Sequence, residues 1–217
     1  MNRPIPWPEF DAEVALVRRL VLDRPWVRPN GEDDRALRSA FRHWTPTDGE
    51  PTTLMLAPLW PRVPTDGWRG LDEAGVGRAV HHAALVLHLL ALGLDPDEPG
   101  TPTHNLGAAA KAAGVAEGRF VRLVNAPAPA RLGALGRLFR RLRQRGVLLR
   151  LTASKPGDGE PDRRSTLRTL HDPRYDDLAA LLAFLFTAGP KRSVSRWAAG
   201  YYRTEAPAEA PAEAPTA

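Results

Sequence analysis

Histidines are the side chains in this sequence best suited to hold a metal ion. His81, His82 and His88 fall in one apolar stretch, at spacings of one, six and seven residues. A zinc-binding helix instead places two histidines four residues apart on one face, with a carboxylate nearby. No pair in this stretch has that spacing. We therefore interpret these histidines as buried or interfacial, and we expect no metal and no other cofactor.

Motifs that mark catalytic or nucleotide-binding sites do not occur in the sequence. It has no Gly-x-Ser-x-Gly elbow, no Walker loop and no Rossmann glycine fingerprint. Gly107 has no further glycine before Gly114, so it does not begin a phosphate-cradling loop. The acidic residues between Asp95 and Glu98 stand among prolines, a pattern typical of a solvated turn rather than of a cation site. We predict a protein without catalytic activity.

Arginine is the residue whose number and placement indicate a function. The chain has 27 arginines, 3 lysines and a net charge of +5. Residues 1–103 carry a net charge of −4, residues 104–203 carry +12 and residues 204–217 carry −3. A basic half is the electrostatic signature of a protein that faces a polyanion such as nucleic acid. A solvated arginine-rich surface, or a GC-rich genome, would give the same composition, so the counts alone do not decide.

Three predicted helices in residues 104–142 position these arginines. Residues 108–113 form a short helix that stops at Gly114, which suits the left-handed conformation after a helix. The second covers residues 116–124, with apolar residues at i, i+3 and i+4 from Phe120. The third has an apolar face and an arginine face, formed by Leu132, Leu135, Leu138, Phe139 and Leu142 on one side and Arg137, Arg140 and Arg141 on the other.

The rest of the chain also has helical rather than strand-like spacing. Helices are expected over residues 8–22, 71–92, 173–188 and 191–202. A further helix is expected to begin after a cap at Asn30 or Asp33. Between residues 45 and 70 we expect a long connection that contains one apolar helical turn. We predict an all-α fold of two small helical subdomains or bundles. The predicted divisions are an N-terminal helical region at 1–103, a basic helical region at 104–203 and a disordered Glu-Ala-Pro-Ala tail at 204–217.

Location in the cell is predicted from absent signals. The sequence has no cysteine, which fits a reducing compartment. It has no basic-then-apolar segment near residue 1, and its longest apolar run, residues 83–92, is interrupted by His88 and is too short to span a bilayer. We expect a soluble cytoplasmic protein that does not contact a membrane.

A helix-turn-helix is the alternative interpretation of residues 108–125. In that motif the second helix presents polar side chains of its N-terminal part to base edges. Here that part offers Ala116, Glu117 and Gly118, with Arg119 and Arg122 as the plausible contacts. The apolar residues that follow favour a core. A stand-alone DNA-binding regulator is therefore the second hypothesis.

The order of motifs after residue 78 resembles the small subunit of the type I-E CRISPR Cascade complex, the CasB family. The motifs are Asn-Leu-Gly-x-Ala from Asn105, the short helix that ends at a glycine, Arg-Phe-x-x-Leu from Arg119, and a Leu-x-x-Leu helix that contains Arg137. The segment Arg196-Trp197-Ala198, followed by Tyr201 and Tyr202, also resembles that family. The similarity extends over residues 78–202. The first 70 residues and the loop from residue 152 are longer than the family leads us to expect, and the tail is not part of the resemblance.

The resemblance implies a non-catalytic, all-α subunit that contacts the nucleic-acid backbone and stabilises the displaced non-target strand and the R-loop in antiviral defence. Guide pairing reads sequence in such complexes, and protein reads the backbone. The implied partners are the backbone and large subunits of Cascade, the guide RNA, the target DNA and a second copy of this chain.

Carried over position by position, the resemblance matches Arg119 to the basic residue before the aromatic, and Arg137 to the basic position of the next helix. Lys191 and Arg192 match a late basic pair, and Arg78 lies near the start of the central helix. Family members often have further basic residues after Arg-Phe-x-x-Leu, for which Arg131 is the substitute here. The candidate nucleic-acid-binding residues are Arg78, Arg119, Arg122, Arg131, Arg137, Arg140, Arg141, Lys191, Arg192 and Arg196.

Overall fold

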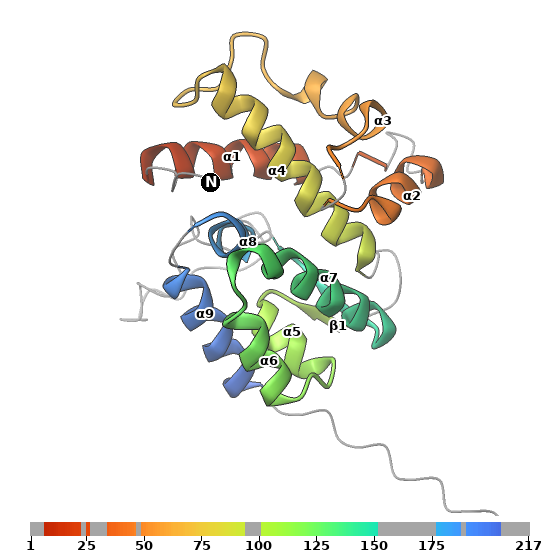
Figure 1. Cartoon of the computed structure of the whole chain (residues 1–217), viewed down its shortest axis with the longest axis vertical. Coiled ribbons are helices and arrows are strands. Elements are labelled where there is room, and N and C mark those ends of the chain that lie inside the picture. Colours follow the sequence, from red (N-terminus) through yellow and green to blue (C-terminus); the bar gives the residue numbers. More distant parts are fainter. Residues whose placement is uncertain are drawn as a thin grey trace, which may run out of the picture.

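The computed structural model describes residues 7–22, 25–26, 34–46, 49–93, 101–151, 177–187 and 190–204. Within these ranges the fold is predominantly helical, as predicted, with nine α-helices and one small pair of strands. The loop predicted from residue 152, the acidic turn after residue 94 and the tail after residue 204 lie outside the described residues. Figure 1 shows the first four helices in the upper part of the molecule and the basic half below them.

The N-terminal half packs around one long helix. It contains α1 (Trp7–Leu22), α2 (Arg35–His43), α3 (Thr53–Leu56), the 3₁₀ turn η1 (Trp60–Arg62) and α4 (Glu73–Leu92). Two aspartates cap these helices, because the Asp34 carboxylate accepts from the N–H of Leu37 and that of Asp72 accepts from the N–H of Gly75. Asp34 therefore replaces the predicted caps Asn30 and Asp33. The predicted apolar turn is α3, whose Met55 is buried.

Helix α4 is the centre of this half. It crosses α1 in Figure 1, and most of its side chains are buried, including those of His82 and His88. Its length and apolar composition would also suit a membrane span. Burial of its surface against α1 and α2 accounts for the same composition in the core helix of a folded domain.

The basic half contains seven described elements, five helices and two short strands. Their bounds are β1 (Thr101–Thr103), α5 (Leu106–Ala112), α6 (Glu117–Val124), α7 (Ala128–Gln144), β2 (Val147–Leu149), α8 (Asp177–Phe186) and α9 (Lys191–Arg203). Each predicted helix is present, although the range predicted as 173–188 is described only over α8 and Thr187, and the one predicted from residue 108 begins at Leu106.

The pair of strands is a correction to the sequence interpretation. β1 and β2 run parallel, with Thr101 opposite Val147 and Thr103 opposite Leu149. Three residues are too few to show the alternation that identifies a half-exposed strand, and all three residues of β2 are buried. Paired residues such as Thr101 and Val147 are 46 positions apart in the sequence. Local sequence patterns therefore did not indicate the pairing.

Helices α5 and α9 form the closest contact in the basic half. Asn105 caps α5, because its side-chain oxygen accepts from the N–H groups of Gly107 and Ala108, while its amide donates to the Arg196 carbonyl at 3.1 Å. Gly114 has a φ of +67° and the N–H of Val115 donates to the Ala110 carbonyl at 3.0 Å, which completes a Schellman motif. The predicted left-handed glycine is confirmed.

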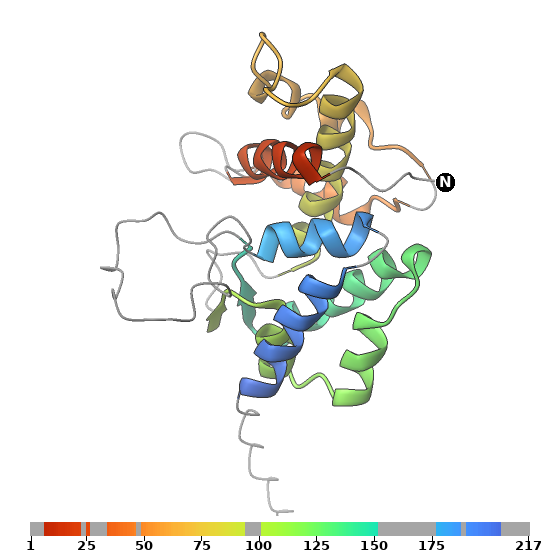
Figure 2. The same ribbon diagram turned by 90° about the vertical axis from the view of Figure 1, so that its left-hand side faces the viewer.

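Helix α8 lies between the two halves, beneath α1 in both views (Figures 1 and 2). Its Phe184 ring packs against Trp197 of α9 at 5.0 Å between centroids, and its Phe186 ring stacks on His82 of α4. Trp197 and Tyr201 are buried, whereas Tyr202 is 59% exposed. One continuous cluster of buried side chains runs from α1 to α9. The division between residues 103 and 104 stays a prediction.

Candidate nucleic-acid interface

Helices α6 and α7 form a hairpin that encloses a groove of about 900 Å³. Residues 125–127 join the two helices (Figure 2) and line the groove, as do Gly114 and Val115 before α6 begins. Five of the predicted arginines line this one groove: Arg119 and Arg122 from α6, and Arg137, Arg140 and Arg141 from α7. The tertiary structure thus brings together residues that are separated by up to 22 positions in the sequence.

The helical periodicity explains why these arginines point outward. In α7 the side chains of Leu135, Leu138, Phe139 and Leu142 are buried, and in α6 those of Phe120 and Leu123 are buried. Because residues three and four apart share a helix face, the intervening arginines are left on the opposite side of each helix. The predicted arginine face of the third helix is therefore one wall of the groove.

The groove is positively charged, with no acidic residue among those that line it. Arg119, Arg137 and Arg140 are exposed, and within the described part of the chain their side chains make no hydrogen bond or ion pair. The Nε of Arg122 donates to the Gly118 carbonyl at 3.1 Å, and that of Arg141 donates to the Ala113 carbonyl at 3.3 Å. Each guanidinium has five N–H donors, so donors remain for an anionic ligand.

Small side chains form part of the groove surface, and sequence reasoning missed them. Ala126, Ala130 and Ala134 follow one another every four residues, with Leu138 next in the series. Ala126 lies in the connection before α7, and the spacing places Ala130, Ala134 and Leu138 on one face of α7. The repeat of small residues is visible in the sequence. That these residues line a groove depends on the position of α6 opposite α7, which the repeat does not indicate. Asn125 and Gln144 add neutral polar groups at the two ends.

Arg131 is not part of this surface, although it lies on the same helix. It is 8% exposed, and its guanidinium donates to the carbonyls of Ala126 at 3.2 Å, Phe184 at 2.7 Å and Thr187 at 2.9 Å. The guanidinium also lies 5.1 Å from the centre of the Phe184 ring. Arg131 thus binds carbonyls at the end of α8, where a positive charge is favourable. Arg131 therefore caps α8 in this structure, and its expected contact with a nucleic-acid backbone stays a prediction.

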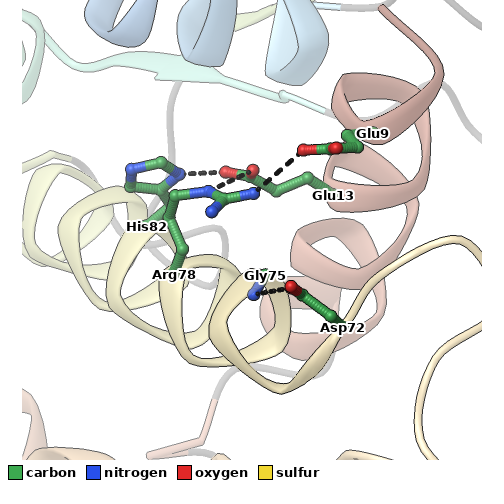
Figure 3. A network of polar contacts seen from close by, with 6 residues as sticks. All are labelled: Glu9, Glu13, Asp72, Gly75, Arg78 and His82. Atoms are coloured by element: carbon green, nitrogen blue, oxygen red, sulfur yellow. Dashed lines mark hydrogen bonds and ion pairs between the residues drawn. The ribbon is translucent and has the colours of Figure 1, made fainter. Parts of the chain in front are cut away.

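Arg78 lies on the other side of the molecule, in a network between α1 and α4 (Figure 3). Its Nε donates to the Glu13 carboxylate at 3.2 Å, and its Nη2 lies 3.6 Å from the carboxylate of Glu9. Glu13 is buried and also contacts the Nδ1 of His82. The structure therefore engages Arg78 with two carboxylates and does not bring it to the groove.

The remaining candidates belong to α9. Arg196 donates from Nε to the Asp177 carboxylate at 2.7 Å, and that buried carboxylate also accepts from the N–H of Leu106. Lys191 and Arg192 are exposed in the first turn of α9. None of the three lines the groove. Arg196 joins α8 to α9, whereas Lys191 and Arg192 remain a separate basic pair at the surface.

Two buried histidines of α4 have perturbed protonation. Burial lowers the pKa of His82, with the charges of His81 and Arg78 acting in the same direction against the raising effect of Glu13. Burial also lowers the pKa of His88, whose Nδ1 donates to the Phe41 carbonyl at 2.7 Å, and the charge of Arg140 adds to this effect. No group of three or more metal-ligating side chains lies within the described ranges.

No family model, no curated protein and no solved structure matches this chain. The candidate interface is therefore argued from its own geometry and charge.

Proposed function

We propose that this chain is a non-catalytic subunit that binds the sugar-phosphate backbone of nucleic acid in the groove between α6 and α7. The observation that carries the proposal is the convergence of five arginines on one groove that no acidic residue lines. Guanidinium groups match phosphate oxygens in geometry and retain their charge at any physiological pH. Phosphate is the anion that a nucleic-acid strand repeats along its length.

The composition of the groove favours contact with the backbone over reading of the bases. Sequence-independent binding of single strands usually combines a basic groove with aromatic rings on which bases stack. Among the described residues, no aromatic side chain lines this groove, and Asn125 and Gln144 are its neutral amides. Phosphate contacts fix position and carry no sequence information. We therefore propose binding that depends strongly on salt and little on sequence.

The proposed setting is the type I-E CRISPR surveillance complex, for which the motif order after residue 78 is the support. There the chain would act as the small subunit, beside the backbone and large subunits, the guide RNA and a second copy of itself. Its groove would hold the displaced non-target strand and so prolong the R-loop. Guide pairing would select the target, as it does in such effectors.

A stand-alone helix-turn-helix regulator is the second candidate, because α5, the left-handed turn at Gly114 and α6 follow one another in that order. Its weakness is that Arg119 and Arg122 face a groove shared with α7. A recognition helix has to protrude into the major groove of a duplex. Tight, sequence-selective binding to a short palindromic duplex by the chain alone would favour this second candidate.

Binding of oligothymidine by variants of the groove tests the backbone function. Arg119→Ala with Arg137→Ala removes one exposed arginine from each wall, and neither makes a protein contact that folding needs. We expect the affinity for a fluorescein-labelled oligothymidine of about 15 nucleotides to fall by about tenfold or more at low salt. The slope of log affinity against log salt should flatten by about 0.7 for each lost phosphate contact. Fluorescence anisotropy over a salt series measures both.

The matched control is Arg35→Ala with Arg69→Ala, which removes the same charge from two exposed positions outside the groove. It should leave most of the affinity intact. Equal loss in both double variants would mean that net charge, and not the groove, attracts the strand. Unequal losses for two oligonucleotides of unrelated sequence would contradict a backbone contact.

Reconstitution with the other Cascade subunits and a guide RNA tests the proposed setting. The chain should copurify with the complex, and R-loops formed by complexes with the groove variant should dissociate faster on two unrelated targets. Complexes that assemble fully without the chain, and whose R-loops are equally stable in its absence, would exclude this setting. The oligothymidine result would still stand as a test of the groove.

A further inference from the structure

The end of α9 contacts the start of α6, one of the two helices that line the arginine groove. The Tyr201 hydroxyl donates to the carbonyl of Val115 at 2.7 Å, and Val115 lines the groove. The neighbouring Tyr202 hydroxyl donates to the Glu117 carboxylate at 2.9 Å. Glu117 is the first residue of α6, two positions before Arg119. The end of α9 therefore lies beside the start of α6, which forms one wall of the groove (Figure 1).

The sequence after Thr204 is complementary in charge to that groove. Residues 205–217 contain Glu205, Glu209 and Glu213 and no basic residue. Their other side chains are small or are prolines, so they offer little apolar surface for packing against the protein. Carboxylate charge is the chemistry that this segment has to offer, and arginine forks are a preferred partner of carboxylates.

The segment is also long enough to reach the arginines. An extended chain covers at most about 3.3–3.6 Å per residue, so Glu209 lies within about 18 Å of Thr204 and Glu213 within about 32 Å. Arg137 and Arg141 are four residues apart on α7, which is about 6 Å along the helix axis. The span of the chain to Glu209 and to Glu213 is thus larger than the spacing of Arg137 and Arg141 along α7.

We propose that the acidic segment 205–217 folds back into the groove and competes there with nucleic acid. The competition rests on the proposed function, whereas the contact between the segment and the groove does not. Tethering gives the segment a local concentration of about millimolar order, which offsets the weakness of exposed ion pairs. Short polyanions are then kept out, while a long strand with more phosphates displaces the segment.

Paramagnetic relaxation tests the contact in the absence of nucleic acid. The chain has no cysteine, so Ala212→Cys provides a single site for a nitroxide label in the full chain. We expect broadening of backbone amide signals of α6 and α7 around Arg119 and Arg141 at about 50 mM NaCl. The broadening should disappear at about 500 mM NaCl, where charges are screened within a few ångströms. It should also disappear in the variant Glu205→Gln, Glu209→Gln, Glu213→Gln. Absence of broadening at low salt would overturn the proposal.

The same three glutamine substitutions, made without the label, test the competition. Affinity for the labelled oligothymidine should rise about threefold to tenfold at about 50 mM NaCl, because the groove is no longer partly occupied. The matched control is Asp11→Asn, Asp66→Asn, Glu73→Gln, which makes the same change in net charge at exposed sites of the other half. An equal rise in affinity for the control would overturn the competition. Removal of three negative charges anywhere on the protein would then be enough to raise the affinity.

The two measurements separate this inference from the proposed function. Broadening that depends on salt and on the glutamates, with no oligothymidine binding even by the glutamine variant, would establish the contact and refute the nucleic-acid function. Oligothymidine binding that requires Arg119 and Arg137 but is unchanged by the glutamine substitutions would support the function and refute the competition.

Discussion

At the scale of single residues, burial separates arginines that look alike in the sequence. Arg131 and Arg137 lie six positions apart on α7, yet the first is buried against carbonyls of α8 and the second is exposed in the groove. A buried carbonyl that loses its donor keeps the full cost of its desolvation. The two residues should therefore respond very differently to the same substitution.

Arg131→Ala should lower the free energy of unfolding by about 2–4 kcal/mol, because it leaves the carbonyls of Phe184 and Thr187 without this donor. Arg131→Lys should recover only part of the loss, since an ammonium group lacks the planar fork. Urea denaturation followed by tryptophan fluorescence measures both. Arg137→Ala is the control on the same helix and should change stability by no more than about 0.5 kcal/mol. Equal effects at the two positions would contradict the capping role.

At the scale of elements, the approach of α5 to α9 depends on glycine. A Cβ atom at Gly107 would overlap the carbonyl of Trp197, and one at Gly200 would overlap the side chain of Asn105. Asn105 caps α5 and also binds α9 through the Arg196 carbonyl. The two helices are therefore held together by backbone contact rather than by interdigitated side chains.

Gly107→Ala should destabilise the protein by about 1–3 kcal/mol, because α9 has to move away from α5 to admit the methyl group. This is opposite in sign to the usual effect of alanine within a helix, which gains up to about 1 kcal/mol over glycine. Gly77→Ala is the matched control, since nothing lies within 4 Å of a Cβ at that position of α4. Thermal unfolding should show the two variants on opposite sides of the parent protein. A stabilised Gly107→Ala variant would contradict the close approach.

At the scale of the whole molecule, α4 and α8 connect the acidic half to the basic half. His82 of α4 contacts Glu13 of α1 and stacks on Phe186 of α8, while His88 is bonded to α2 and feels the charge of Arg140 on α7. Both histidines have a lowered pKa, chiefly because they are buried. Protonation of either one is therefore coupled to the packing of helices from both halves.

The free energy of unfolding should accordingly decrease as the pH falls below about 6.5, the ordinary pKa of histidine. A folded-state pKa below that of the unfolded chain means that the unfolded chain binds more protons in this range, so acid favours unfolding. The contribution of the neutral histidines to the free energy of unfolding is complete above about pH 6.5. It is lost as the pH falls toward the folded-state pKa, with a slope of at most about 1.4 kcal/mol per pH unit for each histidine. Urea midpoints between about pH 7.5 and 5.5 measure it.

The variant His82→Gln, His88→Asn removes both titrating groups and should flatten the pH dependence over this range, although its stability at neutral pH will be lower. A parent protein whose urea midpoint stays constant or rises toward pH 5.5 would contradict the assignment.

The sequence by itself determined most of the helices and the buried face of α7. Apolar residues at i, i+3 and i+4 predicted the helices, the buried face of α7 and the outward direction of Arg137, Arg140 and Arg141. Gly114 marked the end of α5, because few other residues adopt a positive φ at low cost. These features depend on neighbours within a few positions, which is the range over which a sequence pattern carries physical information.

Only the tertiary structure decided which arginines share a groove and which do not. Arg131 follows the same local rules as Arg137, but α8 approaches only the former, so one guanidinium caps a helix and the other meets solvent. The pairing of β1 with β2 and the contact of α9 with the start of α6 also join distant segments. Such contacts depend on the free energy of packing the whole core rather than on local propensity, and periodicity along one helix cannot specify them.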